Sequence, residues 1–413
     1  IQSNNGLKDQ LNKLTERSKV LIVHPTGNTF VKALLDECEK KDLLAKFFTT
    51  IGKGKNTNFI LKNISNRRAY PIPDQKIYRQ WFPEILRLLF GRCKTQKERK
   101  NDTDKVYEKL DRKASENLGK LNVSCVHGYE DGAAHSFLRA KELGIRCSYE
   151  LPIAHWATIR QLLAKEAERY PEWIPTLDSI SENEEKLYRK EQELELADCI
   201  SCPSEFVLQS IPENIRNSKP CQVAHFGSPD ISEGLIEKVD QKNNQKLKIL
   251  FVGSMSQRKG LADLFNALKI LNTHHVSLTI VGQPAMPISF YRAQHTDFKH
   301  IPSCSNDTVK SIMRSHDILI LPSIVEGCAL VQLEALSCGL PIMITRNTGG
   351  EDFIDEKETG FLVPTGNPEK IAEKIEWLIY NRSILPEMKI LSKNKSAKYK
   401  WEIYAKHILD YCK

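Results

Sequence analysis

Two glutamates eight residues apart stand out in the segment EGCALVQLE, which follows the apolar run DILILPS. Glu326 ends the loop after that run, and Glu334 lies in a predicted helix that Gly327 opens. Paired carboxylates that act on a glycosidic bond stand about 5–10 Å apart. Eight residues of helix span about 12 Å and rotate the two side chains by about 80°. The glutamates are therefore poor partners for each other, but they suit the two ends of one elongated ligand.

The backbone between the glutamates offers amide groups at the start of the predicted helix, where an anion is favoured. These amides belong to Gly327, Cys328, Ala329 and Leu330. An anion on them, with hydroxyl-bearing groups at both ends, describes a sugar nucleotide. The structural alternative is that Glu334 is a partly buried helix carboxylate and Glu326 a helix cap.

A second predicted strand end, in FVGSMSQRKG, carries small residues and then two cations. Gly253 and Ser254 end the strand, and Arg258 and Lys259 follow at the start of a predicted helix. Small residues let a backbone approach a ligand, and adjacent cations favour a diphosphate. A solvated helix start with ordinary basic residues is the alternative. The paired glycines of TRNTGGEDFI either allow a similar approach or form a plain turn.

These residues need elements that place them along one edge of a sheet. In the first half, KVLIVHP, FFTTIG, LNVSCVHG, IRCSYELP and DCISCPS are typical of short buried strands between helices. The second half repeats the rhythm with KLKILFVGS, VSLTIVGQ, DILILPS and LPIMITR. The alternation predicts a parallel sheet in each half, with ligands outside the carboxyl ends of the strands. Residues 156–194 are charged and are expected to form one or two exposed helices.

The composition is that of a soluble globular protein of about two domains: 413 residues, 40% apolar, 27% charged and a net charge of +8. It excludes disordered, collagenous and polytopic membrane chains. The first residues, IQSNNGLKDQ, lack the apolar region of a signal peptide. Eleven cysteines without tight spacing fit reduced thiols and a cytoplasmic protein. The pair Cys199 and Cys202 lacks the second pair that a zinc site needs.

Asp102-Thr103-Asp104 matches the D-x-D pattern of some metal sites. Its surroundings, KTQKERKNDTDKVYEK, contain no strand and are typical of a charged loop or helix start. We therefore expect no metal, and no cofactor is indicated elsewhere in the sequence.

Residues 67–113 mix aromatic and apolar residues with many cations. The preferred interpretation is that QWFPEILRLLF packs into the first domain while its charges stay in water. Contact with an acceptor or with a membrane surface is the alternative, since basic amphipathic stretches bind anionic bilayers. The protein would then be peripheral to the membrane. Nucleic-acid binding is not expected.

Together, the motifs of the second half resemble the donor domain of the retaining glycosyltransferases of glycosyltransferase family 4, which have the GT-B fold. VGSMSQRKGLADLFNAL is similar to the family's phosphate-binding strand, loop and helix, and EGCALVQLE to its E-x7-E motif. TGGEDFIDEKETGFLVPTGNPEKIAEKI is similar to the segment after that motif. The resemblance covers about residues 246–381. In the first half, HPTGN resembles the first-strand loop.

The resemblance implies an α/β GT-B architecture, in which two Rossmann-like doubly wound domains face each other across a cleft. Residues 1–226 would form the acceptor-side domain, and residues 227–392 the domain that binds the nucleotide-sugar donor. The terminal helix, within residues 393–413, would pack back on the first domain.

The resemblance also implies roles for single residues. Glu326 would contact the hydroxyls of the donor sugar, and Glu334 the ribose. The diphosphate would lie against Arg258 and Lys259. The other donor contacts implied are Gly27 and Asn28 across the cleft, Gly253 and Ser254 at the phosphates, and Ile301 beside the nucleobase.

The first half departs from the family pattern at one place. The family usually carries a histidine at a strand end near the reacting sugar. Here CSYELPIAHW puts Glu150 near that place and His155 five residues later, and His127 stands at the preceding strand end. All three stay open as candidate sugar contacts, and a structural role is the alternative for each histidine.

The activity that the resemblance implies is metal-independent transfer of a hexose, with retention of anomeric configuration. The donor would be a nucleotide diphosphate sugar, and the acceptor a hydroxyl of a carbohydrate, a lipid-linked molecule or another compound. A sugar-nucleotide epimerase or a phosphorylase on the same fold is one alternative. A non-catalytic subunit that binds a sugar nucleotide is the other.

Overall fold

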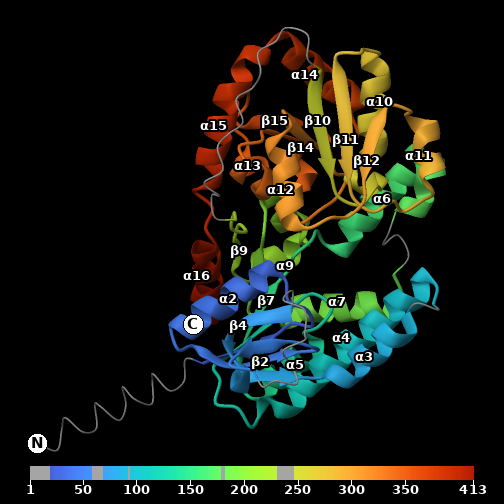
Figure 1. Cartoon of the computed structure of the whole chain (residues 1–413). Helices are drawn as coiled ribbons and strands as arrows, with labels where there is room; N and C mark the ends of the chain where they lie inside the picture. The colour runs from blue at the N-terminus through green and yellow to red at the C-terminus, as the bar shows by residue number, and fades with distance from the viewer. Residues whose placement is uncertain (1–18, 58–67, 92–93, 178–181, 230–245) are drawn as a thin grey trace, which may run out of the picture.

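The computed structural model describes residues 19–57, 68–91, 94–177, 182–229 and 246–413 (Figure 1). The first residues, in which we expect no signal peptide, lie outside these ranges, as do residues 230–245, which follow the expected domain boundary at residue 226. None of the helices in the described part of the chain combines the length and the apolar composition that a membrane crossing requires.

The first half forms a sheet of seven parallel strands in the order β5-β2-β1-β6-β7-β8-β9. Its strands are β1 (Val20–Val23), β2 (Leu44–Thr49), β5 (Ile77–Arg79), β6 (Cys125–Tyr129), β7 (Arg146–Glu150), β8 (Cys199–Cys202) and β9 (Cys221–Val223). A separate parallel pair consists of β3 (Lys53–Lys55) and β4 (Ala69–Pro73).

The second half forms a sheet of six parallel strands in the order β12-β11-β10-β13-β14-β15. Its strands are β10 (Leu247–Val252), β11 (Val276–Val281), β12 (Phe298–Ile301), β13 (Ile318–Leu321), β14 (Ile342–Thr345) and β15 (Gly360–Val363). The prediction of a parallel sheet in each half is confirmed, because short buried strands alternate with helices in both.

Helices connect the strands of each sheet and cover its faces (Figure 1). Those of the first half are α2 (Thr29–Lys40), α3 (Trp81–Phe90), α4 (Gln96–Leu118), α5 (Ala134–Glu142), α6 (Trp156–Arg169), α7 (Glu184–Leu196), α8 (Glu205–Ser210) and α9 (Glu213–Ser218). Those of the second half are α10 (Leu261–Leu271), α11 (Ile288–Gln294), α12 (Asn306–Arg314), α13 (Leu330–Ser337), α14 (Pro368–Tyr380), α15 (Leu385–Ser396) and α16 (Trp401–Cys412).

The carboxyl edges of the two sheets meet. A Cβ atom added to Gly327, after β13, would lie 1.7 Å from the carbonyl oxygen of Pro152, after β7. An apolar cluster joins Ile159 and Leu163 of α6 to Ile324 and Val325. The loops that follow the strands of both halves, where ligands bind in open α/β sheets, therefore lie close together.

The α6 segment is not the exposed helix that its charges predict. Its carboxylate Glu166 is 4% exposed, and Trp173 of the following 3-10 helix η5 (Pro171–Thr176) is 1% exposed. The Trp173 ring packs against Phe265 and Tyr291 of the second half. This part of the first half is therefore a packing element of the second, because its charges have buried partners there.

The C-terminal helix α16 lies against the first half, beside α2 and the strands β6 and β7 (Figure 1). Tyr404 is 1% exposed, and its hydroxyl donates to Glu150 Oε2 at 2.5 Å. Gln222 Nε2 donates to the carbonyl of His407 at 2.9 Å.

Two further expectations are wrong. Core packing is the preferred interpretation of QWFPEILRLLF, but Trp81, Phe82 and Leu89 are 55–67% exposed on α3. Glu84, by contrast, is 2% exposed, because it has ion-pair partners inside the domain. The helix after DILILPS begins at Leu330 with Ala329 as its N-cap, so Gly327 does not open it.

The crossing of the chain into α16 leaves no room at Gly227. An added Cβ atom would lie 2.4 Å from both the backbone nitrogen and the Cγ of Trp401. We expect Gly227→Ala to lower the free energy of unfolding by about 1–3 kcal/mol, as overpacked cores do. Gly91→Ala is the control, because no atom of the residues that the structure describes lies within 4 Å of its added Cβ. Urea unfolding that gave both variants the same stability would contradict this packing.

Candidate functional site

Arg258, Lys259 and Glu326 form one ion-paired group at the carboxyl edge of the second sheet. Arg258 Nη1 and Lys259 Nζ each lie 2.6 Å from Glu326 Oε1. The glutamate is 9% exposed, and burial lowers the pKa of Lys259 although the Glu326 carboxylate opposes this. Two cations on one carboxylate leave a net positive charge, so the group attracts an anion.

The two cations stand on the short 3-10 helix η6 (Gln257–Lys259) and not in the first turn of a long helix. Gly260 follows with φ of +77°, and an added Cβ would lie 2.0 Å from the carbonyl oxygen of Pro322. Ile324 N donates to the carbonyl of Arg258 at 2.9 Å, which ties the turn to the loop after β13. A glycine is therefore required where α10 begins.

Gln257, a residue that the motif pattern does not single out, fixes this turn from inside. It is fully buried, and its Nε2 donates to Glu166 at 2.7 Å and to Asp263 at 3.0 Å. Its Oε1 accepts from the amide of Ala262 at 2.8 Å. Its backbone amide donates to Thr176 Oγ1 at 3.0 Å. Both α6 and η5 therefore hold the turn that carries the cations.

The loop with Glu326 is held by the turn after β14. The amide of Glu326 donates to the carbonyl of Asn347 at 3.0 Å, and Asn347 Nδ2 donates to the carbonyl of Ile324 at 2.9 Å. Gly349 adopts φ of +77°, and an added Cβ would lie 2.0 Å from the carbonyl oxygen of Gly327. The first of the paired glycines thus serves a tight turn against the Glu326 loop. The short polar turn RNTGG is the signal in the sequence for Asn347.

Glu334 lies on α13, half-buried. Burial raises the pKa of its carboxyl group, and Lys310 opposes that effect. Within the described part of the chain, no side chain or amide bonds the carboxylate of Glu334. A sheltered carboxylate without a partner can accept hydrogen bonds from ligand hydroxyls. The structure does not place it in contact with Glu326.

The other donor-side candidates line the strand ends nearby. Gly253 has φ of +148° and lies beside the Lys259 side chain, whose Cε would be 3.7 Å from an added Cβ. Ser254 is exposed, and Ile301 ends β12, where its carbonyl accepts from the amide of Gly282 at 3.0 Å. The amide-bearing residues Cys328 and Ala329 are each 7% exposed.

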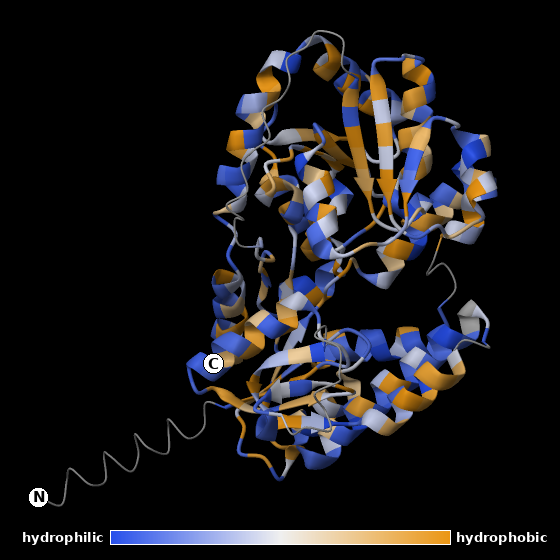
Figure 2. Ribbon diagram, viewed as in Figure 1, coloured by the Kyte–Doolittle hydropathy of each residue, from blue (hydrophilic) through white to orange (hydrophobic). Residues whose placement is uncertain are grey.

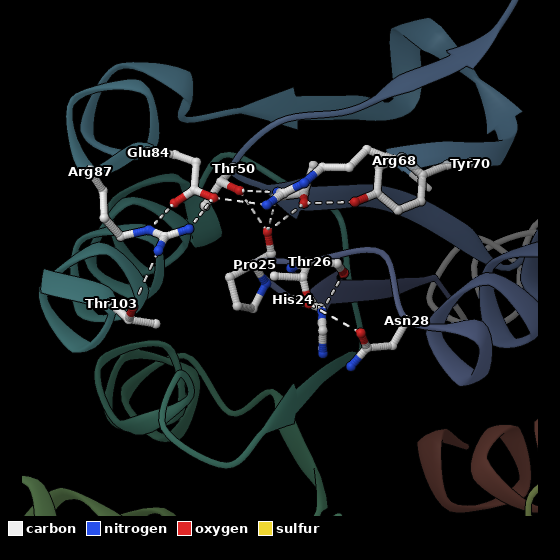
Figure 3. A network of polar contacts seen from close by, with 11 residues as sticks. His24, Pro25, Thr26, Asn28, Thr50, Arg68, Tyr70, Glu84, Arg87 and Thr103 are labelled. Atoms are coloured by element: carbon white, nitrogen blue, oxygen red, sulfur yellow. Dashed lines mark hydrogen bonds and ion pairs between the residues drawn. The ribbon is translucent and has the colours of Figure 1, made fainter. Parts of the chain in front are cut away.

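In the first half, Gly27 and Asn28 lie in the loop between β1 and α2, and Figure 3 shows Asn28 there. Asn28 is exposed, and its Oδ1 accepts from Thr26 Oγ1 at 3.4 Å. Neither residue contacts the group of Arg258, Lys259 and Glu326 in this structure. Figure 3 shows how the loop is held: the carbonyl of Pro25 accepts from Thr50 at 2.6 Å and from Arg68 at 3.3 Å.

The three candidates for the family's usual histidine all point into the protein. His127 is fully buried, and its Nε2 lies 3.7 Å from Glu150 Oε2. Burial disfavours the charged form of His127, but Cys412 and Glu150 outweigh it and raise the pKa. The ring of His155 caps α6 and contacts Glu191 at 3.0 Å, and burial lowers its pKa. The structure gives none of the three a contact with Glu326.

A cavity of about 1030 Å³ lies between α4, α6 and α7. Its inner wall includes Glu130, whose pKa burial raises to about 7 although Lys190, 3.3 Å away, opposes this. Arg160 lies 5.0 Å from the ring of Trp156. Ile153 also lines the cavity, and its Cα would be 3.0 Å from a Cβ added to Gly327. The cavity therefore ends beside the loop that carries Glu326.

Asp102 and Asp104 lie within α4 and not after a strand. Each carboxylate has a lysine partner, Lys94 for Asp102 and Lys186 for Asp104 at 3.1 Å. No group of three or more potential metal ligands is found among the described residues. Cys199 and Cys202 are both buried within β8.

Comparison with known proteins finds a family model that matches part of the chain. Residues 233–398 match the family model described as "Glycosyl transferases group 1". The chain is 28% identical over 193 residues to the capsular polysaccharide biosynthesis glycosyltransferase CapM of Staphylococcus aureus, covering 42% of this chain and 50% of that protein. It is 26% identical over 177 residues to the D-inositol 3-phosphate glycosyltransferase of Jonesia denitrificans, covering 39% and 41%. The chain thus spans about half the length of the curated relatives it matches.

Solved structures match nearly the whole chain. Sucrose-phosphate synthase from Thermosynechococcus elongatus superposes with a TM-score of 0.65 at 14% identity, over 95% of this chain and 97% of that one. Anabaena Alr3699/HepE in complex with UDP superposes with a TM-score of 0.62 at 14% identity, over 95% and 98%. These likenesses confirm the predicted architecture. The chain has the GT-B fold, with two Rossmann-like domains, and its second domain matches the group 1 glycosyl transferases, which supports a GT-B glycosyltransferase.

Proposed function

We propose that the chain transfers a hexose from a nucleotide diphosphate sugar to an acceptor hydroxyl, with retention of configuration and without a metal ion, as family 4 glycosyltransferases do. The observation that carries the proposal is the group of Arg258, Lys259 and Glu326, in which two cations share one carboxylate oxygen. It lies in the part of the chain that matches the group 1 glycosyl transferases. The complex of Anabaena Alr3699/HepE with UDP, a structure of similar fold, supports a nucleotide donor.

The geometry suits a leaving diphosphate. The positive charge of Arg258 and Lys259 would stabilise the phosphate as it departs, which is the main task when no residue acts as nucleophile. Both cations bond Oε1 of Glu326, so Oε2 is the oxygen that would accept from a sugar hydroxyl. The acceptor hydroxyl would arrive on the same face as the leaving group. Glu334, whose carboxylate has no partner among the described residues, would accept from the ribose.

The proposed activity is tested with purified chain and a panel of UDP-, GDP- and ADP-hexoses. We expect slow hydrolysis of one donor, with the released hexose initially in the donor's anomeric configuration by NMR. Because the cations replace a metal, the rate should be unchanged in EDTA. A rate abolished by EDTA and restored by Mn²⁺ or Mg²⁺ would contradict metal independence. Donor binding without any turnover would favour the non-catalytic subunit, and an epimerised nucleotide sugar would favour the epimerase.

The double variant Arg258→Ala/Lys259→Ala should bind the nucleoside diphosphate at least about a hundredfold more weakly, because each charge-assisted hydrogen bond contributes about 1.5–3 kcal/mol. Calorimetry measures the affinity. The matched control is Lys370→Ala/Lys374→Ala, which removes two cations from α14 of the same domain. Unchanged affinity in the first variant would show that these cations do not bind the diphosphate.

The two glutamates should fail in different ways. Glu334→Gln should weaken the donor and the free nucleoside diphosphate alike, because both contain the ribose. Glu326→Gln should leave the affinity for the free diphosphate nearly intact, because the free diphosphate lacks the sugar that Glu326 would contact. It should instead lower kcat, because the sugar contact is made only with the intact donor and strengthens as charge develops.

Melting temperature, diphosphate affinity and turnover of both glutamate variants separate this assignment from a structural role. Equal losses of stability with no ligand-specific pattern would mean that both carboxylates only support the fold. A loss of diphosphate affinity in Glu326→Gln as large as in Glu334→Gln would reverse the two ends of the donor.

A further inference from the structure

Helix α3 buries a charged residue and exposes most of its apolar ones. Glu84 is 2% exposed, while seven large apolar side chains of this ten-residue helix stand in solvent. They are Trp81, Phe82, Ile85, Leu86, Leu88, Leu89 and Phe90, with Leu89 the most exposed at 67%. Figure 2 shows the helix coloured mainly as hydrophobic at the border of the lower domain. Many exposed apolar side chains gathered on one helix are typical of an interaction site.

The inward side of α3 is fixed by charge. Glu84 Oε1 accepts from Arg68 Nη2 at 2.8 Å, and Arg87 donates to both oxygens of Glu84 at 2.7 and 2.9 Å. Arg68 also donates to the carbonyl of Pro25 (Figure 3). The network anchors the helix to the loop after β1, so its apolar residues are held outward as a rigid ridge.

Cations follow the ridge at the start of α4. Arg99 and Lys100 are exposed, nine and ten residues after Phe90. Two bonds keep the start of α4 beside α3: the amide of Lys94 donates to the carbonyl of Gly91 at 3.4 Å, and Arg87 Nη1 contacts Thr103 Oγ1 at 3.5 Å. An apolar helix next to exposed cations matches an anionic lipid surface, where acyl chains lie beneath charged headgroups. Ten residues of helix span about 15 Å, so the ridge would lie in the interface.

The same cations lead to the site. Arg99 and Lys100 line the cavity of about 1030 Å³, which ends at Ile153 beside the Glu326 loop. Within the cavity, Trp156 offers an aromatic face, and carboxylates such as Glu130 can accept from sugar hydroxyls. A path therefore runs from an apolar ridge, past two cations, into a polar cavity next to the donor site.

We propose that α3 and the start of α4 dock on an anionic lipid bilayer, and that the cavity receives the polar headgroup of a lipid-borne acceptor. The apolar chain would stay in the bilayer beneath α3, an anionic group would lie at Arg99 and Lys100, and the acceptor hydroxyl would reach the donor beside Glu326. The docking of α3 and α4 on a bilayer does not depend on the proposed transfer activity, whereas the role of the cavity in binding an acceptor rests on it.

The docking surface is tested by co-sedimentation of the full chain with phosphatidylcholine vesicles, with and without phosphatidylglycerol. We expect clear binding only when phosphatidylglycerol is present. Leu89→Ser/Phe90→Ser should weaken binding about tenfold or more, because two exposed apolar side chains no longer enter the bilayer. Arg99→Glu/Lys100→Glu should reduce binding to the level of phosphatidylcholine alone. Tyr380→Ser, at a side chain 79% exposed on α14, should bind as the wild type does.

No donor is present in the vesicle assay, so its failure and a failure of sugar transfer are separate results. Melting temperatures and calorimetric donor affinity are compared for all variants, and both should stay at the wild-type values. Failure of the wild type to bind, or equal binding by Leu89→Ser/Phe90→Ser, would overturn the proposal. A lowered melting temperature of that variant would instead make α3 a packing element. Sedimentation that showed a wild-type dimer lost in the variant would make the ridge a contact between two copies.

Discussion

The buried side chain of Gln257 is the interaction on which the candidate site depends. Its amide bonds Glu166 of α6 and Asp263 of α10, two carboxylates from opposite halves of the chain. Asp263 in turn accepts from Arg169 at 2.8 Å and from the hydroxyl of Tyr170 at 2.9 Å. Loss of one partner would leave a buried polar group unpaired, at a cost of about 1–3 kcal/mol. One junction thus holds the cation turn and sets the spacing of the two halves.

Because the two halves lie so close together, the glycines of the motifs are needed to avoid clashes within the protein. This explains them better than close approach of a ligand does. Gly327 has no room for a Cβ atom because the carbonyl of Pro152, from the other half, lies against it. Gly349 has no room for one because the carbonyl of Gly327 lies against it. The stretch from Gly327 to Ala329 is nonhelical backbone pressed between the halves. The backbone amides of this stretch therefore lie in the interface between the halves. A ligand would enter beside this interface, near Glu326 and the part of the cavity that Ile153 lines.

The sequence predicted what depends on local pattern. Alternating buried strands and helices specified two parallel sheets, and small or charged residues after β10 and β13 predicted where side chains would gather. It could not predict the burial of α6 or α3, because that burial depends on ion-pair and hydrogen-bond partners that the local pattern does not reveal. Glu166 is buried by Gln257, 91 residues away, and Glu84 by Arg68. The apolar residues of α3 predict a buried helix, but the ion pairs of Glu84 keep those residues facing outward.

The contacts of Glu150, at the end of a strand, could not be predicted from the local sequence either. They also affect which residues the proposed mechanism assigns to the reacting sugar. Its position along the sequence resembles that of the family's usual histidine, yet its carboxylate accepts from Tyr404 of α16 and lies beside His127. The C-terminal helix thus occupies the side of β7 toward which Glu150 points. In the described structure, Glu150, His127 and His155 all have partners within the protein, and none of them contacts Glu326. The chemistry would then fall to Glu326 and the two cations that share its oxygen, and the first half would contribute the acceptor cavity.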